Sequence, residues 1–93
     1  MASIILQMPL FKRAYKKLHV KEQIYVDYAI QEIQKDPEIG ELKKGNLAGV
    51  WVHKFKIYNQ QMLLAYEYTP KNITLLAIGP HENFYLDFKN KHL

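Results

Sequence analysis

The stretch LAIGPHENFYLDFK, from Leu76 to Lys89, changes its pattern half-way. Its apolar beginning is typical of a buried strand, and Gly79-Pro80 is a pair that ends a strand, because proline has no amide proton for the sheet. Phe84 and Phe88 follow at a spacing of four residues, which predicts a short amphipathic helix over residues 81–91. The chain therefore passes from a sheet to a helix within a few residues, and polar side chains stand at the junction.

Two further helices are predicted near the N-terminus. Pro9 is well placed as the first residue of a helix that continues to Leu18, because an amide in the first turn has no helical partner to lose. A second helix is predicted over residues 20–35, where apolar residues recur at helical spacing, and Asp36-Pro37 ends it. Residues 36–49 contain one proline and three glycines and are predicted to form a loop.

Strands account for most of the remainder. The segment SIILQ, residues 3–7, is apolar and β-branched, and three longer strand-like runs cover residues 50–57, 62–68 and 73–79. Short connections make the last three neighbours in hairpins. The predicted order is β-α-α-β-β-β-α in a single domain, residues 1–93. We expect an α+β fold with an antiparallel sheet, a helical hairpin on one face and a short C-terminal helix.

Composition narrows the class of protein. At 93 residues, with 48% hydrophobic residues, the chain can form one ordinary core. It has no cysteine, which excludes disulfides, thiolate zinc sites and a cysteine nucleophile. No apolar run suffices for a signal peptide or a membrane span, so we expect a cytoplasmic protein. The net charge of +4 suits a polyanionic or acidic partner, although many proteins with other functions share it.

A pair of lysines stands on one face of the strand predicted over residues 50–57. Side chains alternate along a strand, so Trp51, His53 and Phe55 share the face expected to meet the core, while Lys54 and Lys56 share the opposite, less covered face. Two ammonium groups on one face form a concentrated site for phosphate. The alternative interpretation is a pair of solvated lysines.

The strand-to-helix junction carries the second candidate. His81 follows the final strand, and imidazole is the side chain whose ordinary pKa suits proton transfer near neutral pH. Tyr85 lies one helical turn further on, where its ring can stack on a base or its hydroxyl can contact a phosphate. A solvated histidine and a packed tyrosine are the alternatives. No second histidine stands at ligand spacing, so neither a metal nor a cofactor is predicted.

Basic residues also gather on the first predicted helix. Like charges at a spacing of four residues mildly destabilise an isolated helix, and a polyanion or an acidic partner relieves the repulsion. We interpret this cluster as a candidate RNA-binding surface, with solvated side chains as the alternative. It consists of Lys12, Arg13, Lys16, Lys17 and Lys21.

The predicted order and three segments of the second half resemble the RelE/ParE superfamily of type II toxins. The segments are LKKGNLAGVWVHKFKI (residues 42–57), MLLAYEY (62–68) and LLAIGPHENFYLDFK (75–89). Each is short and degenerate, but their order and spacing together are fairly specific, and the resemblance covers nearly the whole chain. RelE-type members are ribosome-dependent endoribonucleases that cut messenger RNA, whereas ParE-type members with the same fold poison DNA gyrase.

The resemblance implies roles for four residues. RelE-like enzymes place basic residues at the positions of Lys54 and Lys56, and several relatives carry a catalytic histidine and an aromatic residue at the positions of His81 and Tyr85. The chain departs from the RelE toxin at Leu63, where that toxin has an arginine, so the grip on phosphate falls to lysines, which lack the bidentate geometry of a guanidinium.

The resemblance also implies the partners. We expect a metal-free endoribonuclease that acts on translated messenger RNA at the ribosome and is neutralised by a cognate antitoxin protein. The first alternative is a ParE-like gyrase inhibitor without catalytic activity, and the second is a basic adaptor domain without toxicity. The fold by itself does not choose among them.

Overall fold

The computed structural model describes residues 4–82, 84–85 and 88. Its elements are β1 (Ile4–Gln7), α1 (Pro9–Lys17), α2 (Val20–Lys35), β2 (Glu41–Leu42), a 3-10 turn η1 (Gly45–Leu47), β3 (Trp51–Ile57), β4 (Gln60–Tyr68) and β5 (Asn72–Pro80). Phe84, Tyr85 and Phe88 are also helical. The predicted α+β fold is confirmed. Residues 83, 86–87 and 89–91 of the predicted C-terminal helix lie outside the described residues.

The sheet differs from the prediction in two ways. Its strand order is β1-β5-β4-β3-β2, and β1 runs parallel to β5, so the sheet is mixed and not antiparallel throughout. The two helices between β1 and the later strands allow this parallel crossover. The second difference is β2, which lies inside the predicted loop and pairs with β3 through two residues, too few for an alternating pattern to reveal.

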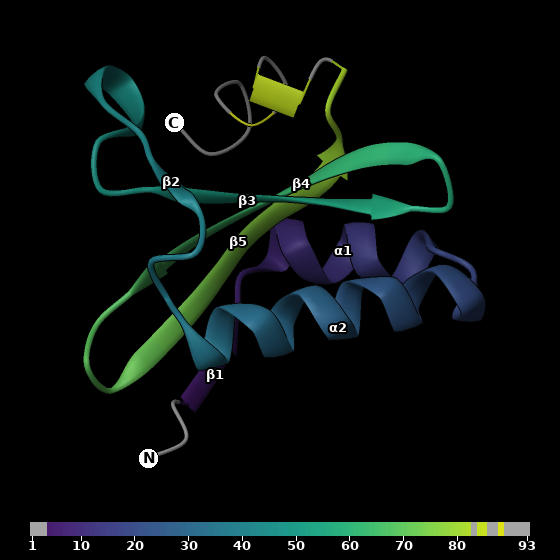
Figure 1. Ribbon diagram of the computed structural model, residues 1–93, viewed down its shortest axis with the longest axis horizontal. Coiled ribbons are helices and arrows are strands. Elements are labelled where there is room, and N and C mark those ends of the chain that lie inside the picture. Colours follow the sequence, from purple (N-terminus) through teal and green to yellow (C-terminus); the bar gives the residue numbers. More distant parts are fainter. Residues whose placement is uncertain (1–3, 83, 86–87, 89–93) are drawn as a thin grey trace.

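The helices form one layer on one face of the sheet (Figure 1). Phe11 of α1 and Val26, Ala29 and Ile33 of α2 are buried there with apolar side chains of β4 and β5. The start of α2 is fixed by a capping box. The His19 side chain accepts a hydrogen bond from the helix backbone, and the Glu22 carboxylate accepts one from the His19 backbone amide. No helix in the described part of the chain combines the length and apolar character that crossing a bilayer requires.

The opposite face of the sheet carries a second, smaller core. Val52, Leu63 and Ala65 are buried there, and Phe84 and Phe88 cover them. In Figure 1 the helical residues after β5 lie on the side of the sheet away from α1 and α2. The face that carries the lysine pair is therefore covered in part and left open in part.

The buried ring of Tyr66 fixes the segment between α2 and β2. Its hydroxyl donates a hydrogen bond to the Pro37 carbonyl at 2.7 Å and accepts one from the Gly40 amide at 3.2 Å. Gly40 approaches the sheet so closely that a Cβ atom there would lie 2.8 Å from the Val52 carbonyl oxygen. Only glycine fits this contact without a shift of backbone, and β2 begins at the next residue.

We expect Tyr66→Phe to lower the free energy of unfolding by about 1–3 kcal/mol, because it leaves the Gly40 amide and the Pro37 carbonyl without their partner. Urea unfolding followed by the fluorescence of Trp51 measures the change. Tyr28→Phe is the matched control, since Tyr28 is 60% exposed and should change stability by less than about 0.5 kcal/mol. Equal urea midpoints for the two variants would contradict this role of Tyr66.

Candidate functional site

The lysine pair lies on the sheet face away from the helices, as the alternation predicted. Lys54 and Lys56 are both exposed. The alternate residues of β3 point the other way. Phe55 packs toward the helical layer, and the imidazole Nε2 of His53 lies 3.3 Å from a carboxylate oxygen of Glu32 in α2. The two ammonium groups therefore share a surface that the helical hairpin does not cover.

His81 lies in the same transverse row of the sheet as Lys56. The backbone amide of His81 donates to the Gln61 carbonyl at 2.9 Å, and Gln61 pairs with Lys56 in the register of β3 and β4. Two strand spacings, or about 10 Å, thus separate the backbones of Lys56 and His81. The imidazole is exposed, so a lysine side chain and this ring can reach one nucleotide linkage from two sides.

Pro80 shapes the end of β5. It pairs with Met62, whereas His81 bonds to Gln61. Hydrogen bonds alternate along an antiparallel pair, so the nitrogen of Pro80 faces away from β4, where its missing proton removes no bond. β1 pairs only with residues 72–75 of β5 and ends before this point. The strand thus runs one residue beyond the predicted end, and His81 leaves the sheet directly after it.

Tyr85 contacts the side chain of Lys43, which directly follows β2 at the opposite edge of the sheet from β1. The ammonium nitrogen of Lys43 lies 5.1 Å from the centroid of the Tyr85 ring, within the range of a cation–π interaction. The Phe84 ring stands nearly perpendicular to Tyr85, with centroids 5.5 Å apart. The ring is half-buried against the second core, so its position is defined by groups on two segments of the chain.

Glu41 joins the basic groups of this surface. Its carboxylate accepts a hydrogen bond from Lys43, and this bond, with the charges of Lys43 and Lys54, holds the pKa of Glu41 below its ordinary value. The same bond raises the pKa of Lys43. Lys43 and Lys54 thus act on the same carboxylate, and Lys43 in turn contacts Tyr85.

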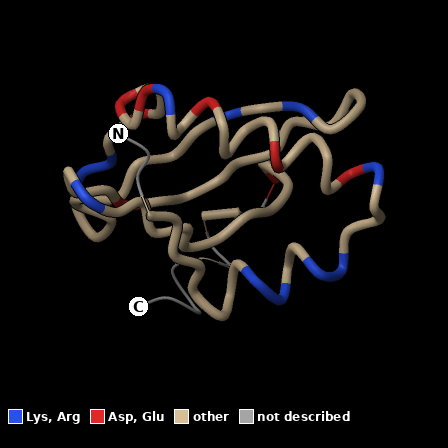
Figure 2. The backbone as a smooth tube through the Cα atoms, turned by 90° about the horizontal axis from the view of Figure 1, so that it is seen from below, with Lys and Arg blue, Asp and Glu red and all other residues tan. Residues whose placement is uncertain are grey.

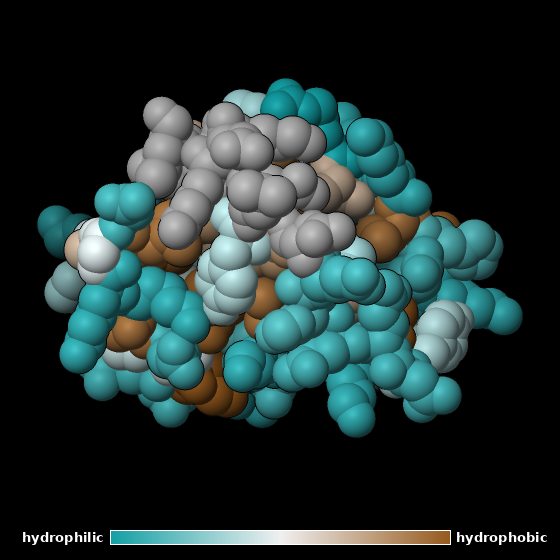
Figure 3. All heavy atoms as spheres, turned by 90° about the horizontal axis from the view of Figure 1, so that it is seen from above, coloured by the Kyte–Doolittle hydropathy of each residue, from teal (hydrophilic) through white to brown (hydrophobic). Residues whose placement is uncertain are grey.

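Two hollows open beside the candidate residues. One is lined by Gln60, Gln61, Pro80, His81 and Glu82. The other is lined by Ile39, Gly40, Glu41, Val52, His53 and Lys54. His81 and Lys54 therefore line different hollows, and the row of Lys56, Gln61 and His81 reaches the first of them. Seen from this side, hydrophilic side chains cover most of the described surface, with apolar patches between them (Figure 3).

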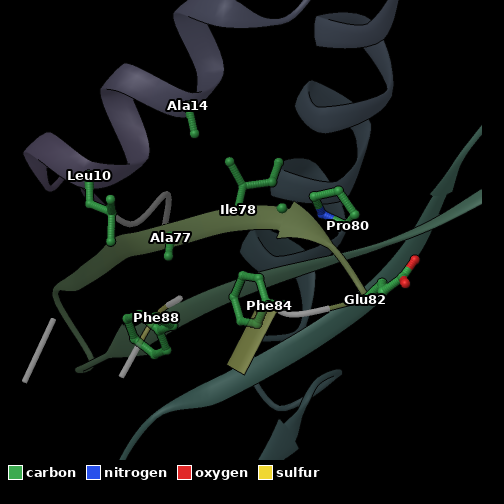
Figure 4. Close-up of a pocket in the computed structure, with 9 residues that line it drawn as sticks. Leu10, Ala14, Ala77, Ile78, Pro80, Glu82, Phe84 and Phe88 are labelled. Carbon is green, nitrogen blue, oxygen red and sulfur yellow. The ribbon is translucent and has the colours of Figure 1, made fainter. Parts of the chain in front are cut away.

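An apolar pocket lies on the other edge of β5. In Figure 4, Leu10 and Ala14 of α1 point toward β5, and Phe84 and Phe88 approach it from the far side. Glu82 is the one titratable residue of its lining. This pocket offers no pair of groups for acid–base chemistry, and its walls belong to the two cores.

The basic residues of α1 lie apart from the strand lysines. Lys12, Arg13, Lys16 and Lys17 are exposed on α1 in the helical layer (Figure 2), on the sheet face opposite to Lys54 and Lys56. Lys16 and Lys17 occupy the last turn of α1, where a positive charge is favoured by the helix dipole. Lys21 is exposed in the first turn of α2. The five predicted RNA-binding residues thus form a second basic surface.

Leu63, where the resemblance places an arginine, has no access to solvent. It belongs to the second core and pairs with Lys54 on one side and Gly79 on the other. A charged group there would be buried beneath the aromatic residues after β5. The positive charge of this surface is therefore supplied by lysines.

Pattern reading missed three residues of this surface: Glu41, Lys43 and Gln61. Glu41 and Lys43 stand in the segment predicted as a loop, and Gln61 was assigned to a turn. Opposite charges two residues apart, at Glu41 and Lys43, were a signal for the first two. Among the residues that the structure describes, no group of three or more histidine, aspartate or glutamate side chains could hold a metal ion.

Residues 5–89 match the model of a family described as ParE-like toxin of type II bacterial toxin–antitoxin system. The chain belongs to this family, and the predicted membership in the RelE/ParE superfamily is confirmed. No curated protein matches the chain.

Solved structures of toxins share the fold. A mutant of the Escherichia coli toxin RelE in the free state superposes with a TM-score of 0.73 at 16% identity, over 100% of both chains. A chain of the RelBE2 toxin–antitoxin complex from Mycobacterium tuberculosis gives 0.72 at 15% identity, over 87% of this chain and 100% of that one. The YoeB dimer from Staphylococcus aureus gives 0.68 at 19%, over 87% and 99%. At these identities the likeness concerns the fold.

The pKa of Glu41 tests the contacts of this carboxylate with Lys43 and Lys54. Lys43→Met should move the pKa of Glu41 back toward its ordinary value, and Lys54→Met should move it by a smaller amount, because the hydrogen bond from Lys43 is the largest cause of the shift. Carboxyl carbon resonances followed by NMR against pH measure both. Since folding lowers this pKa, the carboxylate stabilises the fold above its unfolded pKa and loses that effect as the pH falls through the folded pKa.

Lys56→Met is the control for this titration, because Lys56 does not contribute to the shift of Glu41. A displacement as large for Lys56→Met as for Lys43→Met would show that the general charge of the surface, and not the bond between Lys43 and Glu41, sets the pKa.

Proposed function

We propose that this toxin is a ribosome-dependent endoribonuclease that cleaves translated messenger RNA without a metal ion. The observation that carries the proposal is the transverse row in which Lys56, Gln61 and His81 follow one another across β3, β4 and the end of β5. Lys54 and Lys56 are exposed on the sheet face away from the helices, and His81 is exposed directly after β5. These are the groups that a phosphodiester cleavage by acid–base catalysis needs.

The reaction begins with attack of a ribose 2′-hydroxyl oxygen on the adjacent phosphorus. The 2′-proton passes to the amine nitrogen of Lys54 or Lys56, and the ammonium group of the other lysine stabilises the charge that develops on the phosphate oxygens. As the bond from phosphorus to the 5′-oxygen breaks, His81 protonates the leaving oxygen, and a cyclic 2′,3′-phosphate remains. Tyr85 orients the base or the phosphate. Each proton transfer is worth about 10²–10⁴-fold in rate.

A cognate antitoxin is the expected protein partner. The RelBE2 structure from Mycobacterium tuberculosis and the intact RelBE structure from Escherichia coli are toxin–antitoxin complexes with a similar toxin fold. The basic residues of α1 offer an exposed surface of one charge sign, which suits an acidic antitoxin segment or the RNA of the ribosome. We place this function in the cytoplasm, where translated messenger RNA is found.

A second candidate function is inhibition of DNA gyrase without catalysis. The observation that favours it is the family description, which names the ParE-like toxins. The burial of Leu63 at the place of an arginine also removes one phosphate-binding group from the surface. This function predicts blocked supercoiling and DNA damage, with intact messenger RNA.

The two candidates are separated by a short pulse of expression followed by primer extension on translated transcripts. We expect new cuts within coding regions and growth arrest. His81→Ala and Lys54→Ala should each slow cleavage by about 10²–10⁴-fold and relieve the arrest. Lys71→Ala is the matched control, because Lys71 is an exposed lysine in the turn between β4 and β5, at the other end of the sheet.

Circular dichroism and a thermal melt establish that each variant is folded. Full toxicity of both His81→Ala and Lys54→Ala would show that the assigned site is wrong. Arrest without any cut in messenger RNA, together with loss of supercoiling, would replace the nuclease by the gyrase inhibitor.

A further inference from the structure

Lys43 is held in place more firmly than its neighbours in the basic segment. Its backbone amide donates to the Val50 carbonyl at 2.9 Å, which continues the ladder of β2 and β3 by one residue. Its side chain is only 21% exposed, and its ammonium group bonds to Glu41. The bond to the carboxylate and the packing together direct this long side chain across the sheet.

Lys44 provides the contrast within the same segment. It follows Lys43 directly, carries the same charge and is exposed. Within the described part of the chain, its ammonium group has neither an ion pair nor a ring contact, whereas that of Lys43 lies over Tyr85. The contact with the ring therefore depends on position in the fold and not on the local concentration of lysine.

We propose that Lys43 is a positioning residue of the candidate site, and that its ammonium group, held by Glu41, fixes the ring of Tyr85 against the sheet for contact with RNA. The role in RNA cleavage rests on the proposed function. The contact between Lys43 and Tyr85 stands on the geometry alone: the ammonium group of Lys43 bonds to Glu41 and lies 5.1 Å from the centroid of the Tyr85 ring.

The contact gives Tyr85 a defined orientation. A cation over the face of a ring is worth about 0.5–2 kcal/mol, depending on how far it is removed from water. Phe84 meets the same ring nearly at a right angle, so two neighbours restrict its rotation. A ring that is already oriented loses little conformational entropy when a base stacks on it or a phosphate accepts its hydroxyl.

Glu41 contributes through Lys43. Its carboxylate directs the ammonium group, and without this charge the lysine is free to adopt other rotamers in water. Glu41→Gln keeps an oxygen acceptor and removes the charge, so we expect an effect in the direction of Lys43→Met but smaller. This gives a negatively charged residue a structural role in a positive surface, since its carboxylate bonds to Lys43 and also interacts with the charge of Lys54.

The contact itself is tested without RNA. In protein with labelled tyrosine rings, Lys43→Met should move the ring resonances of Tyr85, and Lys44→Met should leave them in place. Lys43→Arg should keep them close to their original positions, because a guanidinium also binds over an aromatic face. Unchanged Tyr85 resonances in a folded Lys43→Met variant would overturn the proposal.

The role in the reaction is tested by single-turnover cleavage of a translated message in a purified translation system. Lys43→Met should lower the rate at saturating ribosomes roughly three- to thirtyfold, which corresponds to the strength of the contact. Lys43→Arg should restore the rate to within about threefold of the original. Lys44→Met should change only the ribosome concentration at half-maximal rate, as expected for a charge that acts on binding alone.

A double-mutant cycle decides whether Lys43 acts through Tyr85. In a Tyr85→Leu background the ring is absent, so the further change to Lys43→Met should slow cleavage less than about twofold. An undiminished loss in that background would overturn the positioning role and make Lys43 an independent phosphate contact. If the original protein cuts no RNA, the proposed function fails, and the resonance experiment still decides whether Lys43 holds the ring.

Discussion

The hydrogen bonds of the Tyr66 hydroxyl connect the helical layer to the candidate site. They hold the segment after α2 against β4, and the close approach of Gly40 to Val52 brings the chain to the edge of β3. The following residues then pair as β2, which places Glu41 and Lys43 beside Lys54 and Tyr85. The two hydrogen bonds offset the desolvation of this phenol and fix a segment that has few apolar side chains of its own.

The two faces of the sheet differ in how much apolar surface they bury. The helical hairpin covers one face completely enough to bury the large side chains of β4 and β5, and this core supplies most of the apolar burial. On the other face, Phe84 and Phe88 are buried in the second core, while Lys54 and Lys56 are exposed. Lys54 and Lys56 belong to β3, and His81 directly follows β5, so the candidate side chains are held by strands whose positions the first core helps to determine.

Much of the fold could be predicted because its signals are local. Pro9 marks the first turn of α1, Asp36-Pro37 marks the end of α2, and the alternation along β3 separates the lysines from the core side chains. The parallel pairing of β1, the two residues of β2 and the contact of Lys43 with Tyr85 could not be predicted in this way. Each depends on residues that are distant in sequence, and only the folded chain defines those distances. Of the candidate site, the sequence predicted the lysines and the histidine, whereas Glu41, whose carboxylate bonds to Lys43, was not predicted.

The proline at the end of β5 has a consequence for the protein in a crowded cell. In the described part of the chain, no strand pairs with the outer edge of β5 beyond Leu75, and an unpaired edge invites strand addition from a second molecule. The ring of Pro80 offers no donor on that side and obstructs a neighbouring backbone, while α1 packs along the same strand. Pro80, which ends β5 just before His81, therefore also hinders edge-to-edge association at this end of the strand.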